Sequence, residues 1–337
     1  MDKLATGLCI VIVSFFTLPY ANLSAETVDE CTLRKFKQST APVTETAIKT
    51  ACEAELLEKA SGESPEPGAI TKRIRQERET QYSRHVITPH KGNYIMPVTY
   101  TDNLNTEVYE DAGIDTSELE DWEAKFQLSL KVPLNYKPIF TEGDGLYFGF
   151  TLQSWWQVYA DGASAPFRET NYQPEIFYIM PLGLHVFNGN SGLIIGFEHQ
   201  SNGRSQPISR SWNRLYMSYL FEKDNFALSF RPWYRIPEDE KDNPNDSDGD
   251  DNPDIDDYMG YFELRAAYRY RDYELTFMGR NNLRSDNHGA AEFSISFPLW
   301  DRLQGYAQYF NGYGESLVDY NHSQERFGIG ILLTGSL

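Results

Sequence analysis

The sequence predicts an all-β fold, a twelve-stranded antiparallel transmembrane β-barrel with a short N-terminal periplasmic extension. Three observations carry this prediction. No segment after the first apolar run is apolar for long enough to form a membrane-spanning helix. From about residue 120 onward, apolar and polar residues alternate, and the polar face carries Glu and Arg in the middle of long strands. Aromatic residues make up 14% of the chain, and many lie near the expected strand ends, as in the interfacial girdles of such barrels.

Residues 1–25 are typical of a secretory signal peptide. Lys3 precedes a short apolar run at residues 8–16, and the small residues Ser24 and Ala25 follow. We therefore expect cleavage near Ala25 and export of the mature chain. A retained N-terminal anchor is the alternative, although the run is short for a spanning helix.

Residues 26–90 form a polar N-terminal extension that is poor in aromatic residues and is expected to be partly helical or disordered. Residues 44–60 suit a helix, and residues 61–68 have the composition of a linker. Cys31 and Cys52 could form one disulfide in an oxidising periplasm, and two reduced thiols are the alternative. The barrel domain is expected over residues 91–337.

Alternation of residue types indicates the strands of that domain. Clear examples are residues 126–132, 262–271, 293–297 and 327–333, where apolar and polar side chains take turns. About eleven such segments follow residue 120, and one more covers residues 94–100. Because single-chain bacterial barrels have even strand numbers, we predict twelve strands. A soluble β-sandwich with aromatic-rich strands is the alternative fold.

The connections between strands predict how the barrel is oriented. A short link at residues 222–225 is expected to be a periplasmic turn. The loop at residues 202–212 and the acidic segment 238–257 would then lie outside the cell. This acidic segment holds eleven Asp and Glu with one Lys, and it supplies about half of the net charge of −19. Nucleic acid is excluded as a partner because so acidic a chain repels phosphates.

His199 and Ser201 are the most informative residues of the sequence. They end the strand-like run at residues 193–198, and since side chains of a strand alternate between faces, both share its apolar face. If the polar face encloses the lumen, the apolar face meets lipid. On the next strand Asn213 shares the apolar face of residues 215–221, so the three side chains can converge on one outer wall.

Such a group of residues suits nucleophilic catalysis. A Ser hydroxyl attacks once a His accepts its proton and a third group fixes the His tautomer. An amide in the third position avoids placing a carboxylate beside lipid, where a charge is costly. An ordinary interfacial His with neighbouring polar residues is the alternative interpretation.

Residues 197–215, FEHQSNGRSQPISRSWNRL, resemble the active-site region of the outer membrane phospholipase A family. The resemblance continues in SWWQ at 154–157, in PFRETNY at 166–172, in DNPD and YMGY between 251 and 261, and in GYGESLVDYN at 312–321. It covers most of the chain from about Thr88 to the C-terminus.

This resemblance implies a twelve-stranded barrel in the cell outer membrane that hydrolyses acyl esters of membrane phospholipids and lysophospholipids, with A1 and A2 activity. It implies Ser201 as the nucleophile, His199 as the proton acceptor and Asn213 as the group that orients His199. It further implies a requirement for calcium and activation by homodimerisation. The implied calcium ligands are the carbonyl of Arg204, the hydroxyl of Ser209, Ser164 of a second subunit and, in the monomeric state, Asp251.

Two features depart from this pattern or add to it. Leu152 stands where relatives can carry a Gln on a dimer-facing strand, so a polar contact buried in lipid is lost. Residues 246–250, DSDGD, faintly resemble the start of an EF-hand, which we interpret as a generic divalent-binding or screening loop. The residues alone leave two other classes open: a passive porin or cation-binding surface barrel, and a soluble periplasmic esterase.

Overall fold

The computed structural model describes residues 65–83, 85–160, 166–243, 246–300, 303–335 and Leu337, together with Leu33, Ile48 and Lys49. The predicted signal peptide, Cys31, Cys52 and Ser164 lie outside the described residues, as does the expected helix at 44–60 apart from Ile48 and Lys49. The chain divides into two compact units, Met1–Ser64 and Pro65–Leu337. The second unit contains the barrel.

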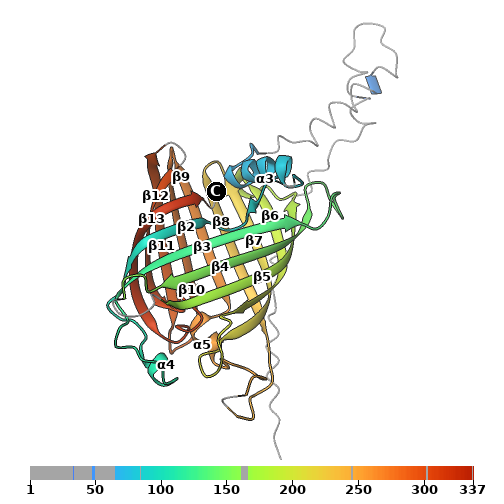
Figure 1. The fold of residues 1–337 in the computed structure, drawn as a ribbon. Coiled ribbons are helices and arrows are strands. Elements are labelled where there is room, and N and C mark those ends of the chain that lie inside the picture. The colour runs from blue at the N-terminus through green and yellow to red at the C-terminus, as the bar shows by residue number, and fades with distance from the viewer. Residues whose placement is uncertain are drawn as a thin grey trace, which may run out of the picture. The chain divides into compact units, whose positions relative to one another are not determined.

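Twelve antiparallel strands, β2 to β13, close into a ring (Figure 1). Each strand pairs with the next one in sequence, and β13 pairs with β2, so every strand of this ring has a partner on both sides. The ring consists of β2 (Asn93–Tyr100), β3 (Trp122–Pro133), β4 (Gly145–Trp156), β5 (Phe167–Leu182), β6 (Asn190–Ser201), β7 (Ser211–Lys223), β8 (Phe226–Ile236), β9 (Phe262–Tyr270), β10 (Tyr273–Asn281), β11 (Gly289–Trp300), β12 (Leu303–Tyr313) and β13 (Ser323–Thr334).

The prediction of a twelve-stranded antiparallel barrel is confirmed. One further strand, β1 (Thr88–Pro89), pairs with the end of β3 and lies outside the ring. The sequence does not predict β1, because two residues are too few to show an alternating pattern.

The two ends of the barrel differ in their connections. A turn of two residues, Asp224 and Asn225, joins β7 to β8 at one end, in agreement with the short link expected there. Helix α3 (Ala69–Thr80) lies at this end, whereas α4 (Glu107–Glu110) and α5 (Ile255–Met259) lie at the other (Figure 1). A short 3-10 helix, η1 (Val186–Asn188), precedes β6. Among the described residues, no helix is both long and apolar enough to cross a membrane.

Helix α3 lies within the extension at residues 26–90, which the sequence predicts to be partly helical or disordered, but its bounds are a finding of the structure because the predicted helix lies at residues 44–60. Its first turn is held by Glu222 of β7, whose carboxylate accepts hydrogen bonds from the amides of Gly68 (3.2 Å) and Thr71 (3.0 Å). These are amide groups that a helix start leaves without an internal partner. A Cβ at Gly68 would lie 2.6 Å from the Glu222 carboxyl, so a larger residue there would displace this carboxylate from the start of the helix. The helix therefore depends on a contact that is distant in sequence.

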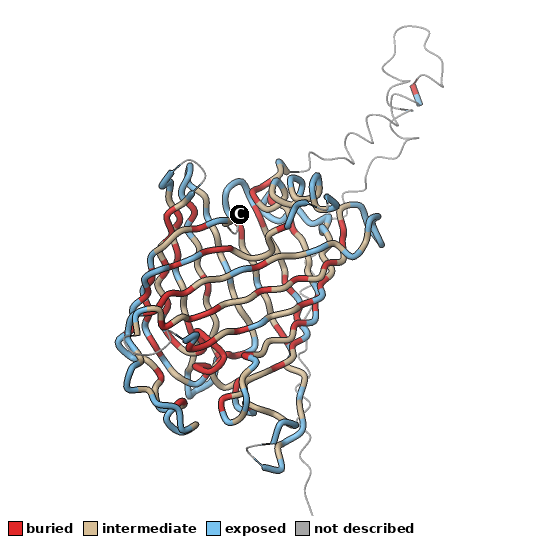
Figure 2. The backbone as a smooth tube through the Cα atoms, in the orientation of Figure 1, coloured by how far each residue is buried: buried red, intermediate tan, exposed pale blue. Residues whose placement is uncertain are grey.

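Along strands such as β7 and β13, buried residues alternate with more exposed ones (Figure 2). On β6 and β7, Phe197 and Leu215 are 40% and 50% exposed, whereas Glu198 and Trp212 are 1% and 0% exposed. Phe197 and Leu215 thus face outward, whereas Glu198 and Trp212 face the interior. This polarity is the reverse of that in a soluble sandwich and fits a wall surrounded by lipid.

The interior of the barrel is filled by paired charges and aromatic rings. Glu123 of β3 accepts a hydrogen bond from the guanidinium group of Arg168 (2.7 Å) and forms an ion pair with that of Arg326 (2.9 Å), and all three side chains are almost fully buried. Lys125 and Arg326 in turn bind Glu315 at 2.8 and 2.7 Å. Because Glu315 belongs to the β12–β13 connection, that connection is held inside the barrel. A polar cavity of 330 Å³ remains between these groups and the end that carries α3.

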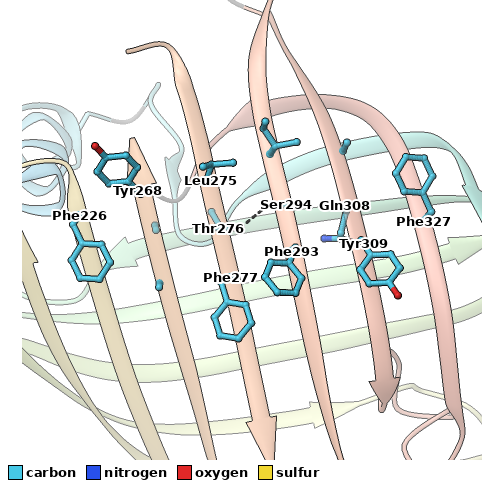
Figure 3. Close-up of a pocket in the computed structure, with 14 residues that line it drawn as sticks. Phe226, Tyr268, Leu275, Thr276, Phe277, Phe293, Ser294, Gln308, Tyr309 and Phe327 are labelled. Carbon is cyan, nitrogen blue, oxygen red and sulfur yellow. Dashed lines mark hydrogen bonds between the residues drawn. The ribbon is translucent and has the colours of Figure 1, made fainter. Parts of the chain in front are cut away.

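An apolar groove of 500 Å³ runs along the outer wall over β8 to β13. Figure 3 shows aromatic rings around it, with Phe277 and Phe293 next to each other and Phe226 at one side. The small residues Ala266 and Ala307 leave the space between them. None of these strands carries His199, Ser201 or Asn213, so we interpret the groove as lipid-facing wall.

Glu123→Ala is expected to destabilise the barrel strongly, because it leaves two buried guanidinium groups without their shared carboxylate. Breaking a buried ion pair in this way lowers the free energy of unfolding by about 3–5 kcal/mol. Urea unfolding of the refolded barrel in lipid vesicles measures this difference. Arg284→Ala, which removes an exposed pair with Asp286, is the control and is expected to leave the urea midpoint unchanged. Equal midpoints for both variants would contradict the assignment.

Candidate functional site

The site forms where β6 and β7 end and the loop between them begins. Both strands follow the alternating pattern, and their register pairs His199 with Asn213 and Ser201 with Ser211. The three predicted site residues therefore lie on the outer wall, at the end of the barrel that carries α4 and α5. All three are partly buried.

His199 and Asn213 are in direct contact. The Nδ1 atom of His199 lies 2.9 Å from the Oδ1 atom of Asn213. Since an amide oxygen only accepts hydrogen bonds, Nδ1 carries the proton in this arrangement. The other ring nitrogen, Nε2, then has the lone pair that a general base needs.

Ser201 lies two residues beyond His199 on the same face of β6, next to Tyr172 of β5 in the strand register. Ser201 and His199 lie on the same outer wall. In the part of the chain that the structure describes, no hydrogen bond joins their side chains. The structure thus brings His199 and Asn213 together and places Ser201 beside them. In related catalytic groups this last hydrogen bond often forms only with substrate bound.

Asn202 organises the loop that follows Ser201. Its side chain is buried, its oxygen accepts hydrogen bonds from the amides of Arg204 (3.2 Å) and Arg210 (3.0 Å), and its nitrogen donates to the carbonyl of Ile208 (2.8 Å). Gly203 between them has a φ of 63°, in the left-handed region that favours glycine. The side chain of Asn202 therefore holds the loop together by hydrogen bonds to its backbone, and the chain continues directly into β7.

Two of the predicted calcium ligands are in contact. The hydroxyl of Ser209 donates to Oδ2 of Asp251 at 2.7 Å, and Gln206 donates to Oδ1 at 2.6 Å. The ammonium group of Lys241 also lies 2.5 Å from Oδ1. Burial alone would raise the pKa of Asp251, but the hydrogen bonds from Lys241, Ser209 and Gln206 outweigh it, so the pKa of this carboxyl lies below its ordinary value.

The position of Asp251 depends on its neighbour Asn252, which is fully buried and accepts a hydrogen bond from the amide of Ser211 (3.1 Å). Arg204 lies in the same loop as Ser209, and its guanidinium group donates to the carbonyl of Phe167 (2.7 Å). Hydroxyl and carboxylate oxygens such as those of Ser209 and Asp251 are ligands that calcium prefers, as are backbone carbonyl oxygens such as that of Arg204.

Other acidic residues of the 238–257 segment have different contacts. Asp250 accepts hydrogen bonds from Arg235, with both carboxylate oxygens 2.6 Å from one guanidinium nitrogen. In the part of the chain that the structure describes, no cluster of three or more His, Cys, Asp or Glu could hold a metal ion. A metal near Asp251 would therefore rely mainly on hydroxyl and carbonyl oxygens.

Comparison with known proteins identifies the family. The model of the phospholipase A1 family matches residues 70–333. The chain belongs to the phospholipase A1 family. Curated family members named phospholipase A1 are 36% identical in Klebsiella pneumoniae and 37% identical in Escherichia coli K12. Each alignment covers 79% of this chain, and it covers 87% and 86% of the two relatives, respectively.

Solved structures of the phospholipase A1 family share the fold. An active-site mutant of outer membrane phospholipase A from Escherichia coli matches with a TM-score of 0.70 and 36% identity, over 78% of this chain and 98% of that one. A Salmonella typhi outer membrane phospholipase, described as a dimer with bound calcium, has the same TM-score, identity and coverage. The expected family and barrel are thereby confirmed.

Glu238 is a neighbour of the site that the sequence analysis does not predict. Its carboxylate oxygen Oε1 accepts a hydrogen bond of 2.9 Å from Nδ2 of Asn213. One acid among eleven in the 238–257 segment carries no distinguishing pattern, and only the path of the chain beyond β8 selects this one.

Asn202→Ala is expected to loosen the β6–β7 loop without unfolding the barrel, because it removes three hydrogen bonds from within the loop and none from the strands. Limited trypsin digestion of the folded protein should then cut faster after Arg204 and Arg210 than in the parent protein. Asn287→Ala, in the exposed β10–β11 connection at the same end, is the matched control. Unchanged cleavage in Asn202→Ala would show that the loop is held by other contacts.

Proposed function

We propose that this protein is a calcium-dependent outer-membrane phospholipase that hydrolyses acyl ester bonds of phospholipids and lysophospholipids, with both A1 and A2 activity. The observation that carries the proposal is the contact between His199 Nδ1 and Asn213 Oδ1 on the outward, apolar wall, beside Ser201. Membership of the phospholipase A1 family supports the ester substrate. In a soluble esterase these groups would lie in a cleft open to water, not on an apolar outer surface.

The proposed reaction begins when the Ser201 hydroxyl attacks the carbonyl carbon of an acyl ester. His199 accepts the hydroxyl proton at Nε2 and then donates it to the leaving alcohol, so that a lysophospholipid departs and the acyl group stays on Ser201. Water then attacks this ester, again with His199 as the base, and releases the fatty acid. Asn213 holds the imidazole ring in the required tautomer throughout.

The proposed calcium site fits the oxygen atoms around the β6–β7 loop. We assign Ser209, the carbonyl of Arg204 and Ser164 of a second subunit to the dimeric state, and Asp251 to the monomeric state. Ser209 and Asp251 lie within hydrogen-bonding distance of each other, so one cation could contact both side chains. Calcium would have to displace the Lys241 ammonium from the Asp251 carboxylate. Bound calcium supplies positive charge where the ester oxygen becomes negative.

We also propose that the active form is a homodimer in which two outer walls meet in the membrane. The related Salmonella typhi protein is described as a dimer with bound calcium. Leu152 of β4 pairs with Leu128 of β3 and Tyr172 of β5, so this part of the wall is mainly apolar. Such a surface can pack against the same surface of a second subunit, but it makes no buried polar contact at position 152. We therefore predict a weak dimer whose formation depends on calcium.

Ser201→Ala is expected to lower the rate of phospholipid hydrolysis by at least about 10³-fold, because the nucleophile is lost. The measurement is fatty-acid release from mixed micelles by purified protein with calcium. Ser205→Ala, which changes an exposed Ser of the same loop, should keep the parent rate. Hydrolysis that persists in Ser201→Ala would overturn the mechanism.

Asp251→Asn is expected to raise the calcium concentration needed for half-maximal crosslinking and hydrolysis by about tenfold or more, because the monomer loses the charged ligand with which it binds calcium before it forms the active dimer. Calcium titrations of hydrolysis and of chemical crosslinking between subunits, run on the same samples, measure the effect. Asp248→Asn, in the same acidic segment, is the control and should titrate like the parent. Full activity of the parent in excess chelator would refute the calcium requirement.

A further inference from the structure

The contact between Asn213 and Glu238 follows from the path of β8. Asn213 pairs with Ile236, the last residue of β8, and Glu238 follows two positions later. The carboxylate of Glu238 thereby reaches the side of the Asn213 amide that faces away from His199. The distance from Asn213 Nδ2 to Glu238 Oε1 is 2.9 Å, equal to that from Asn213 Oδ1 to His199 Nδ1.

The Asn213 amide could take either of two orientations, and Glu238 favours one of them. Rotation of an Asn side chain by half a turn exchanges its oxygen and nitrogen with little change in shape. The rotated amide would present its NH₂ group to His199 Nδ1 and favour a proton on Nε2, where the base could not accept the Ser201 proton. The rotated amide would also point its oxygen at an ionised carboxylate, which only accepts hydrogen bonds. Glu238 therefore selects the orientation that base catalysis needs.

The loop that carries Glu238 is itself held in place. The amide of Asp250 donates to the carbonyl of Asp239 at 2.8 Å, directly after Glu238. Three residues beyond Glu238, Lys241 binds Asp251 at 2.5 Å. Glu238 is thus presented by an ordered segment, which limits how far its carboxylate can move from Asn213.

We propose that Glu238 is a positioning residue for the reaction. It fixes the Asn213 amide so that His199 keeps its proton on Nδ1, and it extends the catalytic group to a Ser–His–Asn–Glu series built from β6, β7 and the residues after β8. The negative charge of Glu238 then lies beyond the strand ends, where water screens it. The neutral amide of Asn213 lies on the wall. This inference rests on the proposed function, because it concerns the base of that reaction.

Glu238→Ala should lower kcat by about 10- to 100-fold with little change in KM, as expected for the loss of one hydrogen bond to a charged group. Glu238→Gln keeps an oxygen that can accept from Asn213 and should restore most of the rate. Glu240→Ala changes an exposed acid two residues away and should behave like the parent. In an Asn213→Ala background, Glu238→Ala should have no further effect, because the residue acts through that amide.

The ring ¹⁵N resonances of His199 give a readout that does not require activity. In the parent, Glu238→Gln and Glu240→Ala they should show the Nδ1-protonated tautomer, and in Glu238→Ala a mixture of both tautomers. A Glu238→Ala protein with the parent's kcat and tautomer would overturn the proposal. So would a Glu238→Ala substitution that lowers kcat by the same factor in the Asn213→Ala background as in the parent. If the parent itself hydrolyses no phospholipid, the proposed function fails, and the tautomer comparison still decides whether Glu238 orients Asn213.

Discussion

Closure of the twelve-strand ring is the constraint from which the other features follow. Once β13 pairs with β2, each strand has a neighbour on both sides, and every side chain of the wall must point either inward or outward. Register and parity then decide the environment of each residue. The same rule that sends Glu198 into the interior places His199 on the outside, although the two are adjacent in sequence.

The two faces of the wall solve opposite electrostatic problems. Inside, carboxylates such as Glu123 and Glu315 are buried but each contacts more than one cation, so their charges are compensated. Outside, an uncompensated charge beside lipid would be costly, and the wall carries only an imidazole, a hydroxyl and an amide at the site. Glu238, which contacts Asn213, and the pair of Lys241 with Asp251 lie in the loop beyond β8.

This division explains why the site lies at the ends of strands. Chemistry on an ester needs a base, an oriented ring and positive charge near the oxyanion, and only the first two can be built from neutral groups. At the boundary between wall and loops, neutral residues from the strands meet charged residues from the connections. Asn202 and Asn252 hold these connections close to β6 and β7, so the strand residues and the loop residues keep fixed positions relative to each other.

The sequence by itself determined the features that depend on a period of two. Alternation predicted the strands, their number and the shared outer wall of His199, Ser201 and Asn213, because facing depends only on counting along a strand. Only the tertiary structure decided which residues meet across strands and loops. Helix α3 forms against Glu222, and Glu238 is selected from eleven acidic residues by the path of the chain after β8. Such contacts join segments far apart in sequence, and no local pattern of residue types encodes them.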